Sequence, residues 1–230
     1  MPLASRKLVQ ATLRQQIVQE IRQAILNRSL LPGERLVERT LAERLGTSLT
    51  ATREALIQLE TEGLITKKPN ATTHVTKLTP GEVEQIYAVR RVLERYAFEE
   101  AARVSDENSI KKLRELHRTA IEVARSNDDT AYISADLKWH EAVWESTGNS
   151  CLVESLRRVV VPLFGFSAIA THHGFNLKHD AQTHAPLLAA IAACDPAAAV
   201  TAFDKFAEVW HQQSVSESKT AQKLKVRIIK

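Results

Sequence analysis

A helical pattern of apolar positions begins the chain. These positions recur every three or four residues, and they are Leu13, Ile17, Ile21, Ala24 and Ile25. Such spacing predicts an amphipathic helix of about five turns. Pro32 and Gly33 then form a turn signal, so the helix is expected to end before them.

Two shorter helices and a hairpin are predicted next. The first helix covers Glu38 to Leu45 and is stopped by Gly46, because glycine favours the left-handed backbone of helix ends. Ser48 is a suitable N-cap for a second helix over residues 49–62. The β-forming residues of segment 65–75 flank a Pro-Asn turn, as in a small hairpin. Three helices followed by a hairpin are typical of a winged helix-turn-helix.

Only helices are predicted beyond the breaker Thr79-Pro80-Gly81. They form an all-α bundle of about six helices with these approximate ranges: 81–104, 106–126, 129–147, 150–171, 180–193 and 196–215. The fold class is therefore mainly α, with a winged helix-turn-helix domain over residues 1–78 and a helical domain over residues 79–218. A basic tail, residues 219–230, is expected to be disordered.

Charge is divided unevenly between these segments. Residues 1–78 hold 12 Lys/Arg against 7 Asp/Glu, residues 79–218 hold 14 against 20, and the last 12 residues hold 5 Lys/Arg and no acid. A basic N-terminal part on an acidic body suggests a module that faces a polyanion. Ordinary solvated surface charge is the alternative explanation.

Three features favour the cytoplasm. The segment MPLASRKLVQ lacks the apolar stretch of a signal peptide. The longest apolar run, Val159 to Ala170, is too short to cross a bilayer. Cys151 and Cys194 suit a reducing compartment, where two buried thiols are the simplest expectation. We therefore expect a cytoplasmic protein with no membrane partner.

Several short motifs follow one another in the N-terminal domain. They are Pro32-Gly33-Glu34-Arg35-Leu36, Leu41-Ala42, Leu45-Gly46, Arg53-Glu54-Ala55-Leu56, Leu59-Glu60 and Gly63-Leu64. With these motifs, in this order and spacing, residues 10–78 resemble the GntR family of bacterial transcription regulators. The resemblance implies a homodimer that binds double-stranded operator DNA, most often as a repressor, and that is not an enzyme.

The helix over residues 49–62 is expected to read the DNA. A recognition helix enters the major groove by its N-terminal end, where the helix dipole and hydroxyl side chains favour phosphate and base edges. The first turn and the resemblance together give these expected contacts: Arg35, Ser48, Thr50, Thr52 and Arg53, with Lys67, Lys68 and His74 on the wing. An ion pair with Glu34 or Glu38 is the alternative role for Arg53.

The chain departs from the family where basic contacts are expected. Leu49 stands where the family has an arginine, and Ala51 where it has a proline. Ala71 and Thr72 replace the Arg-Gly of the wing tip. We therefore expect an unusual operator, or weaker binding with a shallower dependence on salt.

A second group of motifs lies in the helical domain. It consists of Val89-Arg90 with Leu93-Glu94, then Asp136 to Asn149, then Thr183 to Ala199. Here the chain resembles the ligand-binding FCD domain of the FadR branch of the family. Asp136 and His140 are four residues apart and share one helix face. The resemblance adds His184 as the third ligand of one divalent metal ion, such as Zn, Ni or Mn.

The effector is expected to be a small organic acid, and the protein a ligand-responsive regulator. The resemblance implies that Arg90 faces the effector, where its guanidinium would pair with a carboxylate, and an ion pair with Glu94 is the alternative. Metal-binding relatives have a histidine where this chain has Phe206, so the site holds three ligands or has lost its metal. The loss would favour a polar cluster without metal, or a metal-free acyl-CoA effector.

A different hypothesis is an enzyme. A metal-dependent hydrolase would use Asp136, His140, His179-Asp180 and His184.

Overall fold

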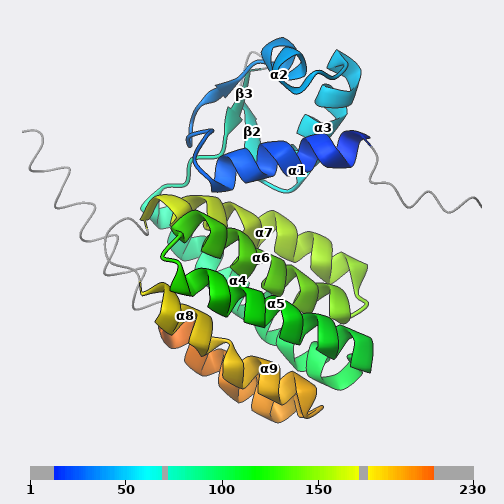
Figure 1. The fold of residues 1–230 in the computed structure, drawn as a ribbon, viewed down its shortest axis with the longest axis vertical. Coiled ribbons are helices and arrows are strands. Elements are labelled where there is room, and N and C mark those ends of the chain that lie inside the picture. The colour runs from blue at the N-terminus through cyan, green and yellow to red at the C-terminus, as the bar shows by residue number, and fades with distance from the viewer. Residues whose placement is uncertain (1–12, 69–71, 171–175, 210–230) are drawn as a thin grey trace, which may run out of the picture.

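The structure is a computed structural model that describes residues 13–68, 72–170 and 176–209, except for the side chains of residues 166–170. A small N-terminal domain lies at one end of a larger helical domain (Figure 1). The expected basic tail, the wing-tip residue Ala71 and the end of the last expected helix fall outside the described residues.

The N-terminal domain is a helix-turn-helix with a three-stranded sheet. Its elements are α1 (Leu13–Leu26), β1 (Arg35–Leu36), α2 (Glu38–Leu45), α3 (Leu49–Thr61), β2 (Ile65–Lys68) and β3 (Thr72–Val75). The strands are ordered β1-β3-β2, and β3 pairs antiparallel with both neighbours. The short strand β1 was not predicted, because two residues show no alternation of apolar and polar positions.

Local signals set the helix ends in this domain. Gly46 ends α2 with a positive φ of 62°, as expected for a left-handed cap. Ser48 starts α3, and its side chain accepts a hydrogen bond from the backbone N–H of Ala51 at 3.1 Å. The described part of the first helix ends at Leu26, before the left-handed residue Arg28 and ahead of Pro32-Gly33 as expected.

The second domain is an all-α bundle, as predicted. Its elements are α4 (Pro80–Val104), α5 (Glu107–Arg125), α6 (Asp129–Ser146), α7 (Ser150–Ala170), α8 (Leu177–Thr183), α9 (Ala185–Ala192) and a helical segment over residues 196–209. Thr79 and Glu82 form a reciprocal capping box at the start of α4. None of the helices in the described ranges has the length and apolarity that crossing a membrane requires.

Two predictions about this domain were wrong. The single helix expected over residues 180–193 is broken at His184 into α8 and α9. Pro186 explains the break, because it has no N–H to donate to the carbonyl one turn earlier. Cys151 and Cys194 are exposed rather than buried: Cys151 lies in the first turn of α7, and Cys194 follows α9 with a positive φ of 53°.

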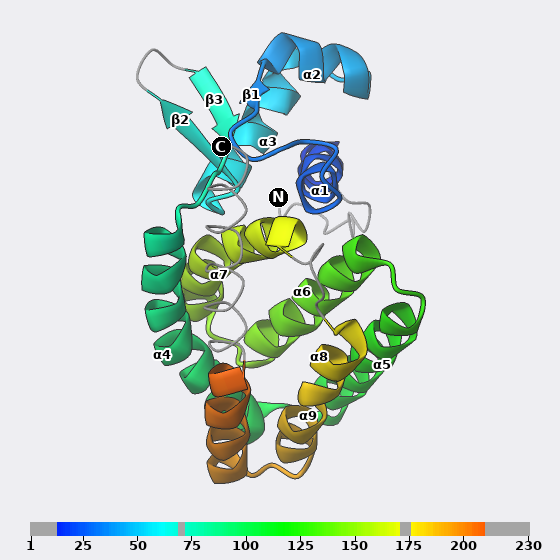
Figure 2. The same cartoon turned by 90° about the vertical axis from the view of Figure 1, so that its left-hand side faces the viewer.

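Helix α6 lies at the centre of the bundle. It packs against α4, α5 and α7 (Figure 2). Trp139 and Trp144 on α6 are fully buried, so both indoles belong to the core rather than to a dimer interface on the surface. The same helix also reaches α1 of the first domain.

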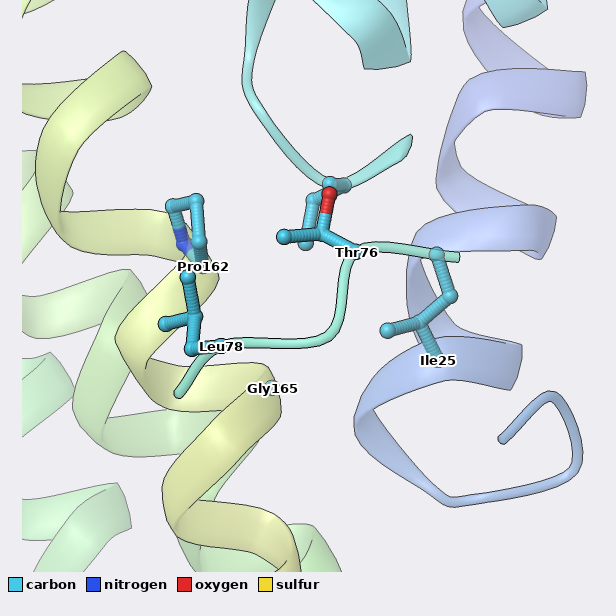
Figure 3. Close-up of a pocket in the computed structure, with 6 residues that line it drawn as sticks. Ile25, Thr76, Leu78, Pro162 and Gly165 are labelled. Atoms are coloured by element: carbon cyan, nitrogen blue, oxygen red, sulfur yellow. The ribbon is translucent and has the colours of Figure 1, made fainter. Parts of the chain in front are cut away.

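The two domains meet closely where α3 ends. Gly63 has a positive φ of 73°, and a Cβ at this position would lie 2.9 Å from the backbone oxygen of Arg158 and 3.0 Å from Cγ of Pro162 on α7. Beside this contact, Thr76 and Leu78 of the linker lie between Ile25 and Pro162 (Figure 3). Only about 10 Å³ of space remains at this point, so the linker fills the contact between α1 and α7 here.

Candidate functional site

Asp136, His140 and His184 come together inside the helical domain. Asp136 and His140 lie on one face of α6, and His184 lies at the break between α8 and α9. Nε2 of His184 is 3.2 Å from Oδ1 of Asp136 and 3.2 Å from Nε2 of His140. One ligand atom from each residue lies within 4.8 Å of the others, and all three residues are buried. The structure thus brings together the three predicted ligands.

The outer nitrogens of both imidazoles face acceptors. Nδ1 of His184 lies 3.1 Å from the backbone oxygen of Asp180, which can only accept a hydrogen bond. Nδ1 of His140 lies 2.9 Å from Oε1 of Glu94, an ion-pair contact that is not aligned as a straight hydrogen bond. In a neutral ring, Nδ1 of His184 therefore carries the proton and its Nε2 turns a lone pair toward Asp136. The carboxylate of Glu94 favours the same placement of the proton on Nδ1 of His140.

Glu94 is held as a carboxylate in this interior. It accepts from Nε of Arg90 at 2.5 Å and from Nε1 of Trp144 at 3.0 Å. Burial alone would raise the pKa of Glu94. The charges of Arg90 and His140 lower it by more than burial raises it, so the pKa falls to about 2. The predicted alternative for Arg90, an ion pair with Glu94, is what the structure shows.

The other acids beside the cluster behave differently. Burial raises the pKa of Asp136. Burial, and then the charge of Asp136, raise the pKa of Asp180 to about 6, although Tyr132 donates to its Oδ2 at 2.7 Å. Burial lowers the pKa of His184 to about 3, so this ring is neutral near pH 7. Desolvation thus disfavours adding charge to the cluster unless an opposite charge balances it.

Aromatic rings enclose the cluster. Phe206, at the position of the expected fourth ligand, lies with its ring centroid 5.0 Å from His184 and 5.9 Å from His140. The ring centroids of Trp139 and His184 lie 4.6 Å apart. Phe164 packs against His140 and lies 5.8 Å from the guanidinium of Arg90. The surroundings are therefore apolar on several sides, and Phe206 supplies no ligand atom.

The residues present fit a divalent cation. Three lone-pair atoms, one carboxylate and two imidazole, converge where a cation or a shared proton would balance them. Both histidines have acceptors behind them, as metal-bound histidines usually do. Sequence reasoning missed Glu94, Tyr132 and Asp180 in these roles. Glu94 and Asp180 reach the cluster from α4 and α8, and Tyr132 on α6 acts through its hydrogen bond to Asp180.

The predicted DNA-reading residues gather around the start of α3. Ser48 and Thr50 are exposed there, and Arg35 is exposed on β1. Arg53 is also exposed, but its guanidinium pairs with Glu38 at 2.8 Å, one of the two ion pairs expected as an alternative. Leu49 is 43% exposed, so the position where an arginine was expected faces outward in this chain.

Thr52 was predicted to contact DNA, but the structure does not leave it accessible. It is fully buried, and its hydroxyl bonds that of Thr47 at 2.9 Å across the turn. It therefore helps to hold the turn and is unavailable to DNA. On the wing, Lys68 is exposed, Lys67 pairs with Glu60 at 3.0 Å, and His74 is half-buried.

The hydrolase cluster is incomplete, because Asp136, His140 and His184 converge but His179 does not join them. Asp180 on α8 and His184 directly after it are buried, whereas His179 is exposed. His179 lies within α8.

Comparison with known proteins agrees with this architecture. Residues 13–75 match the model of bacterial regulatory proteins of the gntR family, and residues 85–208 match the FCD domain. The chain belongs to the GntR family and carries an FCD domain. It is a DNA-binding transcriptional regulator, not an enzyme.

Two related regulators and one solved structure illustrate the match. The HTH-type transcriptional regulator YdhC of Bacillus subtilis is 31% identical over 73% of this chain and 74% of its own length. A probable D-xylose utilization operon transcriptional repressor of Paenarthrobacter nicotinovorans is 26% identical over 85% of this chain and 86% of its own. The structure of E. coli McbR/YncC has the same fold, with a TM-score of 0.77 at 21% identity over 93% of this chain and all of that one.

Proposed function

We propose that this GntR-family regulator is a cytoplasmic repressor whose FCD domain binds a small organic acid through a divalent metal ion. Asp136, His140 and His184 would hold the metal. The observation that carries the proposal is the convergence of three lone-pair atoms from these residues in a buried site. A buried set of acceptors is unfavourable unless a cation or a proton lies among them.

The protein would supply three ligands, and the metal would supply a Lewis acid for an anionic effector. Three ligands leave coordination positions for the carboxylate oxygens of an organic acid or for water. Glu94 and the backbone oxygen of Asp180 would fix the two imidazoles in the orientation that directs Nε2 inward. Arg90 would contact the effector only by sharing its guanidinium with Glu94.

A metal-free acyl-CoA effector is the second candidate. Phe206 supports it, because its ring lies against both imidazoles at the place of the missing ligand. An apolar ring there would favour an apolar chain over a hydrated ion.

DNA binding is proposed to use the outer surface of α3 and the wing as a homodimer. Arg35, Ser48, Thr50 and Arg53 would contact the duplex from one protomer, with Lys67, Lys68 and His74 on the wing. A two-fold dimer matches a palindromic operator.

The exposed apolar residues Val89, Val92 and Tyr96 follow one face of α4 and are the surface we propose for the dimer contact.

The metal proposal is tested on purified protein treated with a chelator. Calorimetric titration with Zn²⁺, Ni²⁺ and Mn²⁺ should show one ion bound per chain, and His184→Ala should abolish that binding. His179→Ala is the matched control, since it removes an exposed histidine of the same helix pair. No binding by the wild type, or equal loss in both variants, would contradict the metal site.

The effector class is tested by thermal unfolding. A ligand that binds only the folded state raises the melting temperature by mass action. Stabilisation by di- and tricarboxylic acids only in the presence of metal would support the first candidate. Stabilisation by acyl-CoA in the chelator-treated protein would support the second.

A further inference from the structure

A buried arginine of the DNA-binding domain lies between two acids. Nη2 of Arg22 on α1 is 2.6 Å from Oε2 of Glu62, and its Nη1 is 3.6 Å from Oε1 of Glu141 on α6. The side chains of Arg22 and Glu62 are each only 9% exposed. The guanidinium therefore connects an acid of its own domain with an acid of the effector domain.

The acid on each side has a particular position. Glu62 is the C-cap residue of α3, the recognition helix, and it also accepts from Nε2 of Gln58 at 3.0 Å. Glu141 directly follows His140 of the buried cluster. A single side chain, Arg22, thus separates the end of the recognition helix from the helix that supplies two of the three candidate ligands.

A second arginine contacts the same oxygen of Glu141. Nε of Arg157 on α7 lies 3.1 Å from Oε1 of Glu141, and its Nη2 lies 2.7 Å from Oε1 of Glu145. One carboxylate oxygen is therefore shared by an arginine of each domain. The contact to Arg157 is the shorter one at present, and a small displacement of α6 would alter the balance between the two.

Helix geometry explains how α6 serves both sites. Successive residues are rotated by about 100° on an α-helix, so Glu141 points well away from the face shared by Asp136 and His140. Ser134 lies within about 20° of Glu141 on the same projection, and its hydroxyl accepts from Nε2 of Gln23 on α1 at 3.1 Å. One side of α6 thus meets the cluster and another side meets α1.

We infer that Glu141 is the positioning residue that couples the occupancy of the buried cluster to the placement of the recognition helix. This inference rests on the proposed function for the identity of the ligand, but not for the contacts. Binding at Asp136 and His140 shifts or fixes α6, which changes how Glu141 is divided between Arg22 and Arg157. Arg22 then changes its hold on Glu62 at the end of α3. Coupling of this kind is reciprocal, so DNA binding also changes affinity at the cluster.

The test compares Glu141→Gln with Glu145→Gln. Both variants remove one negative charge from α6 and one acidic partner of Arg157, but only Glu141 of these two acids pairs with Arg22. Amide hydrogen exchange of peptides that cover residues 49–62 is measured with and without saturating Zn²⁺. Calorimetric titration checks that each variant binds Zn²⁺, and thermal unfolding checks that each is folded.

In the wild type and in Glu145→Gln, Zn²⁺ should change exchange in α3 by about fivefold or more, the low end of typical allosteric coupling. In Glu141→Gln, Zn²⁺ should bind with nearly unchanged affinity and leave exchange in α3 unaltered. The inference is overturned if Glu141→Gln retains the full response, or if Glu145→Gln loses as much of it.

A second comparison does not depend on a metal. Asp136→Asn perturbs the cluster by removing one charge without changing the shape of the side chain. It should change exchange in α3 when Glu141 is present, but not in the double variant with Glu141→Gln. An equal effect in both backgrounds, or no effect in either, overturns the inference. If the wild type fails to bind Zn²⁺ while this comparison succeeds, the metal proposal fails and the coupling role of Glu141 stands.

Discussion

Nε2 of His140 and Nε2 of His184 lie 3.2 Å apart, although each ring turns its other nitrogen toward an acceptor. With a proton on each Nδ1 alone, the two Nε2 atoms present lone pairs to each other, and Asp136 adds a carboxylate oxygen 3.2 Å from Nε2 of His184. This buried arrangement of two lone pairs and a carboxylate oxygen is unfavourable without a positive charge between the three atoms. It is the physical reason for placing a cation or a proton at this point.

Phe206→His should strengthen metal binding, because it places a fourth candidate ligand against both imidazoles. Tetrahedral sites are commonly completed by a fourth protein ligand, so we expect the dissociation constant for Zn²⁺ to fall by about tenfold or more. Calorimetric titration measures it. Phe206→Leu is the control for losing the ring, and an equal gain in that variant would contradict a ligand role.

Gly63→Ala should destabilise the protein more than Gly46→Ala. Both glycines have positive φ, 73° and 62°, so alanine costs about 1–2 kcal/mol at either position. A Cβ at Gly46 would meet no atom within 4 Å, whereas one at Gly63 would lie 2.9 Å from the backbone of Arg158. We therefore expect an additional loss of about 1–3 kcal/mol for Gly63→Ala. Urea unfolding measures it, and equal losses would mean that the domains do not pack closely here.

Leu49→Arg should strengthen DNA binding, since Leu49 is exposed at the start of the recognition helix. One added phosphate contact would steepen the dependence of log K on log salt by about 0.9. Fluorescence anisotropy with a duplex selected by the wild type measures affinity and slope. Ile57→Arg adds the same charge two turns farther along α3, where the side chain is 50% exposed. Equal gains in both variants would indicate a general charge effect instead of a contact by residue 49.

Val92→Glu should weaken the proposed dimer, because Val92 is 69% exposed on the apolar stripe of α4. An unpaired buried carboxylate costs more than about 1.4 kcal/mol, which raises the dimer dissociation constant by at least about tenfold. Sedimentation analysis over a range of concentrations measures this change. Val104→Glu, at the far end of α4, should leave the dimer intact. An unchanged dimer in both variants would place the contact elsewhere.

Asp180 should make the chelator-treated protein less stable as the pH rises from about 4 to about 6. Burial, with the charge of Asp136, raises its pKa to about 6 in the folded state, above the ordinary value of 3.8. A raised carboxyl pKa contributes stability below the unfolded pKa, and this contribution is lost as the pH rises through the folded pKa. Asp180→Asn should remove up to about 3 kcal/mol of this pH dependence. Urea unfolding at pH 4.5 and pH 7.5 measures the free energy of unfolding. An equal change between the two pH values in the wild type and the variant would contradict the prediction.

Much of the fold was predictable from local signals. Glu38 to Leu45 was predicted with the bounds that α2 has, because an apolar stripe ends at a glycine there. Ser48 was predicted as the cap that it is. Thr52 shows the limit of such reasoning: its place in the first turn of α3 was clear, but its burial depends on how the helix is rotated against Thr47.

The candidate site was predictable in its ligands but not in its support. Asp136 and His140 share a helix face by spacing alone, and the family resemblance supplied His184. Glu94 was expected only as a partner of Arg90, since its contact with His140 depends on how α4 packs against α6. No spacing in the sequence reports such a distance between helices.

The two sides of α6 also have a consequence for chimeric regulators. A chimera joined at the linker near Thr79 would combine the α1 of one relative with the α6 of another. Arg22 and Gln23 would then face residues other than Glu141 and Ser134. Such a protein could fold, bind DNA and bind its effector, yet fail to respond. Transplanting a response to a new effector should therefore require the α1 positions that contact α6 to be exchanged together with the helical domain.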